Sequence, residues 1–461
     1  VGALVLALLL RFRLPPLTAA FGTALIVNNY PFPWSTLSGM ETALATFLTT
    51  AAVLAHVTWG RRSGWRMVVA PILMALAAMA RPENLVLFPL SEIDRLILRW
   101  RGGKQAPRKR PALRFAFRAA AFALTMLPYF ALNYTVHGAM LPNTYAAKIG
   151  KLDLAHDVRS TGAESLGLRV KVAWDCLRDG FGYIWGSDNA VLLALAGVGI
   201  LILFLPRRYR GPSGDSLFPL LVFVVGCTAT GIITLGIFFP GQSQRYLIQW
   251  IPLVLVYGVV GLYLVAMVIG AFLPRIAKPA STTVVGAVLL GSALWMAREY
   301  PDQVTDYVTS VKNINEMQVA LGHWVNDNTP PEAVIATNDI GAIAFYGNRP
   351  IVDTIGLIDP EVVRRKNAPD ATDQMVDYLR QRGATHALLF PTWHPDLILD
   401  EHFRPVHRVV LDDNVICGDS RMLVMALDWE LVQRDQPPPE WADEEYDNAK
   451  MWFKVKTAFN R

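Results

Sequence analysis

Long apolar stretches, separated by short basic clusters, run through the chain from residue 1 to residue 297. Several are long enough to cross a hydrocarbon core about 30 Å thick, since a helix rises about 1.5 Å per residue. The whole chain is 53% hydrophobic and 18% charged. The pattern predicts a polytopic α-helical membrane protein, whose longest expected spans are 39–59, 115–134, 217–239 and 246–273.

The basic clusters between these spans indicate an orientation. Residues 99–118 hold eight Arg or Lys residues and no acid, and smaller clusters lie at 11–13 and 61–66. An excess of positive charge in short loops is typical of the cytoplasmic side. The net charge of +5 alone could suggest a nucleic-acid partner, but its placement between apolar spans argues against that function class.

A break interrupts the apolar run 67–98 at Arg81-Pro82-Glu83-Asn84. Proline disfavours helix at the preceding residue and removes a backbone donor, so we expect the helix to stop at Arg81. If the basic clusters on both sides are cytoplasmic, the run crosses the membrane an even number of times. Each arm would then be only roughly 23 Å long. The pattern therefore predicts a short or re-entrant hairpin with its tip near the outer face.

The remaining spans bring the expected total to about ten membrane segments, in a membrane domain of residues 1–297 with an outer loop at 135–189. The parity of the crossings places the chain from Arg298 onward outside the cytoplasm. There the composition becomes that of a small extracytoplasmic α/β domain, residues 298–435. A linker and a last aromatic-rich helix follow within 436–461.

Apolar spacing sets the elements that we expect in this outer domain and in the early loops. We expect a loop at Asn28–Trp34 and a turn at Asp339–Gly341. The helices are expected at Val311–Asn326 and Asp373–Arg382, and the strands at Ala333–Thr337, Pro350–Asp353, His386–Phe390, Val406–Leu411 and Met422–Leu427.

Four polar features share the expected outer face: Glu41, the pair Arg81 and Glu83, the segment Asn143–Lys148, and the segment Gln242–Tyr246. Arginine and lysine where membrane helices open to the outside suit an anionic ligand, and a lipid-linked phosphate or diphosphate is the obvious candidate. Either carboxylate could bind sugar hydroxyl groups or orient an arginine. The alternative is structural: Arg81 pairs only with Glu83, and the other basic side chains extend toward lipid headgroups.

Polar residues of the outer domain are weaker candidates. Asp339 and Asp353 flank a glycine turn and could bind a ligand, although aspartate beside a turn usually satisfies backbone donors. Asp412-Asp413 has no supporting ligands, and the eight His residues show no ligand spacing, so no metal site is predicted. A disulfide between Cys176 and Cys417 is one open pairing. The residues indicate no particular cofactor and leave the participation of a divalent metal ion open.

Five motifs appear in a fixed order along most of the chain. They are Ser38–Leu44, the Arg81-Pro82-Glu83 break, Leu141–Lys148, Arg245-Tyr246-Leu247, and Asn338–Ile343 leading to Asp353 and Gly356–Pro360. The ordered set resembles bacterial type C glycosyltransferases, the group that includes mycobacterial terminal arabinofuranosyltransferases. The resemblance implies a multi-pass enzyme of the bacterial inner membrane. Such an enzyme transfers a sugar from a polyprenyl-phosphate donor to an extracytoplasmic glycan or protein acceptor.

The resemblance also implies roles for single residues. In an inverting transfer, a carboxylate deprotonates the acceptor hydroxyl while Arg and Lys stabilise the departing phosphate. The family's catalytic acid lies in an earlier outer loop, so we expect it upstream of Val1 and assign no catalytic residue. Two other classes stay open: a non-catalytic membrane scaffold whose outer domain binds a partner or glycan, and a transporter. Arg81, Lys148 and Arg245 would bind the donor phosphate, and Glu41, Glu83, Asn143, Tyr145 and Tyr246 would contact the substrates.

Overall fold

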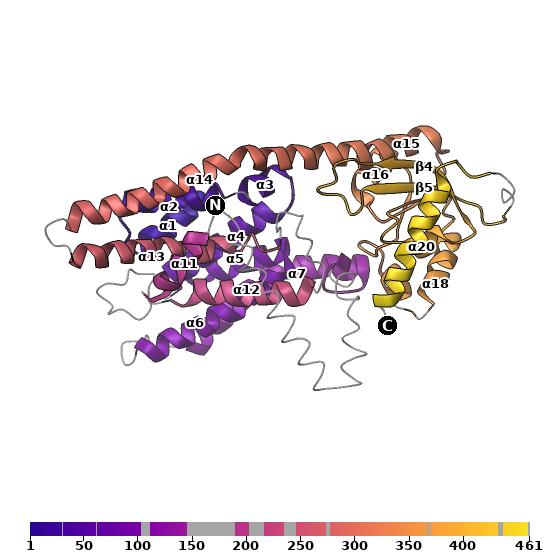
Figure 1. Ribbon diagram of the computed structural model, residues 1–461. Helices are drawn as coiled ribbons and strands as arrows, with labels where there is room; N and C mark the ends of the chain where they lie inside the picture. Colours follow the sequence, from indigo (N-terminus) through magenta and orange to yellow (C-terminus); the bar gives the residue numbers. More distant parts are fainter. Residues whose placement is uncertain are drawn as a thin grey trace. The chain divides into compact units, whose positions relative to one another are not determined.

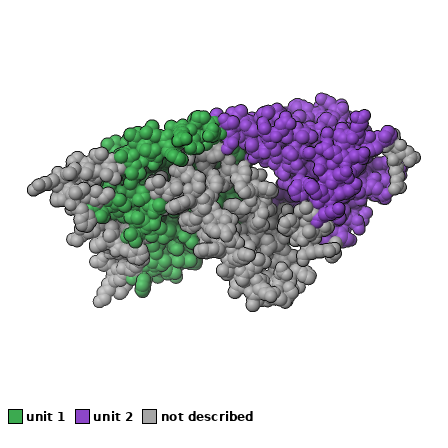
Figure 2. Space-filling view, viewed as in Figure 1, with its two compact units in different colours: residues 1–141, 154–303 green, residues 142–153, 304–461 purple. Residues whose placement is uncertain are grey.

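The structure is a computed structural model of the chain, in which two compact units are distinguished (Figures 1 and 2). The first unit comprises residues 1–141 and 154–303, and the second comprises residues 142–153 and 304–461. The structure describes residues 1–29, 31–60, 62–102, 111–144, 190–201, 216–234, 246–272, 277–366, 368, 370–431 and 437–459.

The first unit is helical throughout its described part. α2 opens with Pro16 at its first helical position, where a missing backbone N–H costs nothing. The expected loop at Asn28–Trp34 is wrong in its second half, because a short helix, α3, occupies Pro31–Leu37. The other helices are α1 (Gly2–Arg11), α4 (Thr42–Trp59), α5 (Arg66–Ala80), α6 (Leu87–Gly102), α7 (Pro111–His137), α11 (Ala190–Ile200), α12 (Phe218–Thr234), α13 (Ile251–Phe272) and the start of α14 (Ala277–Ile314), with α2 ending at Val27.

Within the described residues, three stretches are long and apolar enough to cross a membrane: Thr42–Trp59, Pro111–Val136 and Ile251–Val268. Shorter apolar helices accompany them at Gly2–Arg11, Pro16–Val27, Arg66–Ala80 and Phe218–Thr230. Length and composition thus agree with a membrane protein. The expected total of about ten segments and the outward orientation of the C-terminal unit stay predictions.

The break expected at Arg81 is confirmed. α5 ends at Ala80, and Arg81 has an extended backbone with φ −148° and ψ 122°. A single 3₁₀ turn, η1 (Pro82–Val86), follows before α6 begins. The proline imposes this geometry, since it excludes helical backbone at the residue before it.

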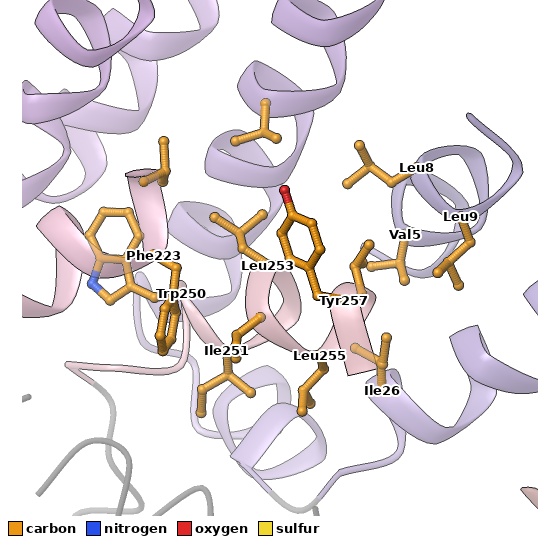
Figure 3. Packing of buried hydrophobic residues seen from close by; sticks show 14 of the residues in the cluster. Val5, Leu8, Leu9, Ile26, Phe223, Trp250, Ile251, Leu253, Leu255 and Tyr257 are labelled. Atoms are coloured by element: carbon orange, nitrogen blue, oxygen red, sulfur yellow. The ribbon is translucent and has the colours of Figure 1, made fainter. Parts of the chain in front are cut away.

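α13 is central to the core of the first unit. Trp250 and Tyr257 are fully buried, and Figure 3 shows side chains of α1, α2 and α12 gathered around this helix. Gly199 of α11 and Gly261 of α13 allow the two helix backbones to approach closely. A Cβ atom on either glycine would collide with a backbone carbonyl of the other helix. Small residues at such a contact are typical of packing between membrane helices.

The second unit is built on a five-stranded sheet of order β2-β1-β3-β5-β4. β1 pairs in parallel with β2 and with β3, while β5 lies antiparallel between β3 and β4. All five strands overlap the segments in which strands were predicted: β1 (Ile335–Thr337), β2 (Ile351–Asp353), β3 (His386–Leu389), β4 (Phe403–Val410) and β5 (Arg421–Leu427).

The second unit also contains several helices, some of which the sequence pattern did not predict. The expected turn at Asp339–Gly341 is the start of a helix, α16 (Ile340–Gly347), which ends at Asn348 in a left-handed conformation. The helix expected at Val311–Asn326 is present but continues α14 through a π-helical turn at Asn315–Val319. The others are α15 (Ala320–Asn328), α17 (Pro360–Lys366), α18 (Ala371–Gln381), α19 (Pro395–Ile398) and α20 (Ala442–Phe459).

The division between the two compact units lies close to Arg298, where the composition changes. It falls within α14, after Gln303, and α14 passes through the change in composition without a break. A change of solvent from lipid to water alters which residues are tolerated, but it does not require the helix to stop. The change of composition at Arg298 therefore falls inside a continuous helix rather than at the end of one.

Candidate functional site

Four of the predicted residues come together in the first unit. Glu41 directly precedes α4, while Arg81 and Glu83 lie between α5 and α6. Tyr246 begins the turn that leads into α13. Three segments far apart in the sequence thus build one cluster, which we call the Arg81 cluster.

Arg81 is at the centre of this cluster. Its Nε atom lies 3.5 Å from Oε1 of Glu41 and 3.5 Å from Oε1 of Glu83. Its guanidinium carbon lies 5.1 Å from the centroid of the Tyr246 ring. The side chain of Arg81 is 5% exposed and that of Glu83 is 6% exposed, whereas that of Glu41 is 50% exposed. Both carboxylates therefore lie beside the guanidinium of Arg81. Of the two, only the carboxylate of Glu41 is widely open to solvent.

A network of buried hydrogen bonds around the amide of Asn84 lies next to the Arg81 cluster in the sequence and holds its segments together. Asn84 donates from Nδ2 to the carbonyl of Ala77 at 3.1 Å and to Oε1 of Gln249 at 2.9 Å. Its Oδ1 accepts from Oγ1 of Thr49 at 3.0 Å. Asn84, Gln249 and Thr49 are all fully buried. The network joins α4, η1 and the segment before α13, and so fixes the three segments that carry the cluster.

Gln249 leaves one polar atom of this network without a partner. Its Nε2 atom is buried and makes no hydrogen bond within the described part of the chain. Buried donors are nearly always satisfied in native proteins, so each exception calls for an explanation. A ligand or a water molecule that accepts from Nε2 would supply one.

A second polar cluster, built around Asp94 in the middle of α6, was not predicted. Asp94 accepts from Nε2 of His56, from Oγ of Ser216 and from the backbone N–H of Leu217, each at 2.9 Å. Arg95 donates to the carbonyl of Gly60. The signal for this cluster is present in the sequence as polar residues inside the apolar runs 39–59 and 85–98. Its members satisfy one another, as a structural role requires.

An ion pair beside this second cluster joins α6 to α7. Arg118 donates from Nε to Oε1 of Glu92 at 2.7 Å and from Nη2 to Oε2 at 2.5 Å. Arg95 also donates from Nε to Oε1 of Glu92, at 3.1 Å. Arg118 is the last residue of the basic run 99–118 that was interpreted as a cytoplasmic loop. Its ion pair with Glu92 joins α7 to α6.

The remaining predicted site residues lie elsewhere or outside the description. Asn143 belongs to the second unit, where its Nδ2 donates to the carbonyl of Gly356 at 2.6 Å. Tyr145, Lys148 and Arg245 lie outside the described residues. Their assigned roles in substrate binding and phosphate binding stay predictions.

Of the two candidate aspartates in the second unit, Asp353 follows the structural alternative. Asp353 accepts hydrogen bonds from the backbone N–H groups of Ile355, Gly356 and Ile358 at 2.8 to 3.1 Å. These bonds hold the turn after β2, in which Gly356 has a φ of +86°. Asp353 is therefore fully occupied by the backbone.

Asp339 has a different environment. It accepts from Nε2 of Gln318 at 2.8 Å, and burial raises the pKa of its carboxyl above the ordinary value. Burial also raises the pKa of the nearby Cys417 thiol to about 11. Cys417 is a free thiol, and Cys176, the other cysteine of the pairing considered above, lies outside the described residues. Among the described residues, no group of three or more His, Cys, Asp or Glu side chains could hold a metal ion.

Comparisons with known proteins find a similar solved structure and a matching family model. No curated protein matches the chain. A crystal structure of ArnT from Cupriavidus metallidurans in the apo state is similar with a TM-score of 0.43 and 12% sequence identity, over 92% of this chain and 82% of that one. Residues 312–452 match the family model described as a domain of unknown function, DUF8728. That matched segment contains all five strands of the sheet.

Proposed function

We propose that this protein is an integral membrane glycosyltransferase that uses a polyprenyl-phosphate sugar as donor. The acceptor is a glycan or a protein on the extracytoplasmic side. The observation that carries the proposal is the Arg81 cluster, in which a buried arginine is held between two carboxylates and against a tyrosine ring. The ordered motifs along the chain, which resemble those of type C glycosyltransferases, support the same proposal.

The charges of the cluster indicate how a phosphate would bind. Arg81 brings one positive charge, while Glu41 and Glu83 bring two negative ones. An anion binds here only if further cations contribute, because like charges nearby oppose it. Lys148 and Arg245 supply them in our proposal, and Arg245 directly precedes Tyr246 in the sequence. Three cations around one phosphate would also stabilise it as the leaving group.

The two carboxylates take different parts in this proposal. Glu83 is buried beside Arg81 and orients the guanidinium toward the phosphate. Glu41 is half exposed, so it is the carboxylate that sugar hydroxyl groups can reach. Asn143, Tyr145 and Tyr246 complete the substrate contacts. The transfer inverts the anomeric centre: the acceptor oxygen bonds to the anomeric carbon, the bond to the donor phosphate breaks, and a carboxylate takes the proton of the acceptor hydroxyl.

Transfer of radiolabelled sugar from a polyprenyl-phosphate donor, measured in native membranes, tests this function. Arg81→Ala should lower the rate at least about 100-fold, in line with loss of one group that stabilises transition-state charge. Arg66→Ala is the matched control, because it removes an exposed arginine from the other end of α5. Equal activity of both variants would overturn the site assignment. Absence of transfer in membranes that hold the intact protein and a panel of such donors would favour the scaffold class.

A further inference from the structure

Two loops of the second unit meet at the carboxyl end of its parallel strands. Asn338 directly follows β1, and its Oδ1 accepts from the backbone N–H of Phe390, which directly follows β3, at 3.0 Å. β1 lies between β2 and β3, and both are parallel to it. The chain leaves β1 toward β2 on one side, whereas β3 lies on the other side. The hydrogen bond therefore joins loops at a topological switch point, the place outside a parallel sheet where ligands usually bind.

The end of α14 and the loop between β4 and β5 reach the same place. Gln318 donates from Nε2 to Oδ2 of Asp339 at 2.8 Å, and its Oε1 accepts from Sγ of Cys417 at 3.5 Å. Asn313 accepts at Oδ1 from the backbone N–H of Val415 at 3.0 Å. Gln318 lies in the π-helical turn, an irregularity that is frequent at functional sites.

The segment after β3 also contacts the loop between β4 and β5. The backbone N–H of Thr392 donates to Oδ2 of Asp419 at 3.1 Å. A Cβ atom on Gly418 would lie 2.5 Å from the ring of Trp393 and 2.9 Å from that of Phe390. Four segments thus contact one another here. We call their polar residues the Asn338 cluster: Asn313, Gln318, Asn338, Asp339 and Thr392.

Three polar atoms of the Asn338 cluster have no hydrogen-bond partner. They are Nδ2 of Asn313, Nδ2 of Asn338 and Oγ1 of Thr392, which are buried and make no hydrogen bond within the described part of the chain. Asn313 is 1% exposed and Asn338 is 3% exposed. Buried polar groups are nearly always satisfied, so three exceptions on segments that contact one another indicate a shared missing partner.

The chemistry of these groups matches a neutral, hydroxyl-rich ligand. The two amide nitrogens donate, the threonine hydroxyl donates and accepts, and the partly exposed Asp339 offers a carboxylate as acceptor. A hydroxyl group accepts from one neighbour and donates to another, so it can pair with both kinds of group. The carboxylates of Asp339 and Asp419 oppose an anion, and the amide donors oppose a cation.

We propose that the Asn338 cluster binds a neutral sugar. Hydroxyl groups of the sugar accept from Asn313 and Asn338, pair with Thr392 and donate to Asp339. The loop between β4 and β5 moves aside as the sugar enters. In the proposed function this sugar belongs to the glycan acceptor, and the inference rests on that function only for the molecule that carries the sugar.

Saturation-transfer difference NMR tests this site in the whole protein, held in nanodiscs to avoid detergents that contain sugar. The probes are the neutral methyl glycosides of glucose, galactose, mannose and arabinose, with methyl β-glucuronide as an anionic counterpart. At least one neutral glycoside should bind, and the glucuronide should bind several-fold more weakly because Asp339 repels it. Absence of a signal from every neutral glycoside would overturn the proposal and leave buried water as the missing partner.

Thr392→Val separates sugar binding from folding. Valine lacks the unpaired hydroxyl, so the Tm should stay the same or rise. Binding of the neutral glycoside should nevertheless weaken by about threefold or more, as expected for loss of one hydrogen bond between neutral groups. Thr58→Val is the matched control, because Thr58 carries a buried, unpaired hydroxyl in the first unit and should bind the glycoside as wild type does.

Two further variants complete the test. Asn338→Asp keeps the oxygen that accepts from Phe390 but loses the unpaired donor, so it should weaken binding by about threefold or more. Equal binding by wild type and either site variant would overturn the proposal, and Thr392→Val decides if Asn338→Asp does not fold. Arg81→Ala should lower transfer but leave glycoside binding unchanged, which distinguishes failure of this inference from failure of the proposed function.

Discussion

The Nδ2 atom of Asn84 lies 2.9 Å from Oε1 of Gln249, and this hydrogen bond joins the α5–α6 connection to the segment before α13. Arg81 stands three residues before Asn84, and Tyr246 stands three residues before Gln249. The amide pair therefore determines how far the guanidinium of Arg81 lies from the ring of Tyr246. It acts as the internal support of the Arg81 cluster.

Replacing Asn84 by Ala should loosen the Arg81 cluster and destabilise the protein. The change removes three hydrogen bonds and leaves Oε1 of Gln249 and Oγ1 of Thr49 buried without this partner, at about 1–3 kcal/mol for each group. Thermal unfolding in detergent should show a lower Tm, and the KM for the lipid-linked donor should rise. Asn28→Ala is the control, because Asn28 is an exposed amide bound only to the helix turn before it. Similar effects of the two variants would contradict the supporting role.

The ion pair between Glu92 and Arg118 should contribute strongly to stability. Both side chains are largely buried and meet in a two-point geometry. Arg118→Ala would remove two charge-assisted hydrogen bonds from the Glu92 carboxylate, at a cost of about 1.5–3 kcal/mol, because Arg95 still pairs with that carboxylate. The double variant with Glu92→Ala should be less destabilised than the sum of the single variants, because the pair is lost as a unit. Additive losses of Tm in this cycle would show that the pair does not act as one.

Two glycines of α11 provide a test of helix packing. Gly199→Ala should prevent correct assembly of α11 on α13, because the added Cβ would meet the backbone at Tyr257. Gly197→Ala, two residues earlier, meets nothing within 4 Å and should raise helix propensity slightly, by about 1 kcal/mol or less. The yield of monodisperse protein after solubilisation measures both effects. Equal yields would mean that the two helices do not touch as described.

Much of the fold follows from residue patterns. Short apolar segments located the five strands, and the proline at position 82 located the end of α5. The helix α16 was missed because its apolar run is too short to show a helical period and begins with residues typical of turns. The short helix α3 was missed for the same reason, since its prolines and aromatics are equally typical of a loop.

The site was predictable only in part. Arg81 and Glu83 are near neighbours in the sequence, and Glu41 and Tyr246 were found through the order of motifs. The amide pair of Asn84 and Gln249 could not be found, because hydrogen bonds between distant segments leave no periodic signal. Polar residues within apolar runs are the one available sign, and they do not reveal which partner each will meet.

The carboxyl of Asp339 should make stability depend on pH. Its pKa is raised in the folded protein, mainly by burial, so the folded state binds this proton more tightly than the unfolded state does. The contribution is fully present below the unfolded pKa, near 4, and is lost as the pH rises through the folded pKa. Asp339→Asn should therefore raise the Tm at pH 7 and remove this pH dependence. The exposed Asp412→Asn should do neither, and equal pH profiles for wild type and Asp339→Asn would contradict the argument.

Binding of undecaprenyl phosphate to the purified protein tests the central claim most directly, since it isolates recognition of the lipid phosphate from the transfer step. Titration of the lipid into protein held in nanodiscs, with native mass spectrometry as readout, compares wild type with Arg81→Gln and with the control Arg66→Gln. Loss of a charge-assisted contact of about 1.5–3 kcal/mol should weaken binding by Arg81→Gln roughly tenfold or more. Arg66→Gln should bind as wild type does. Equal affinity of all three proteins would show that Arg81 is not part of a donor-phosphate site.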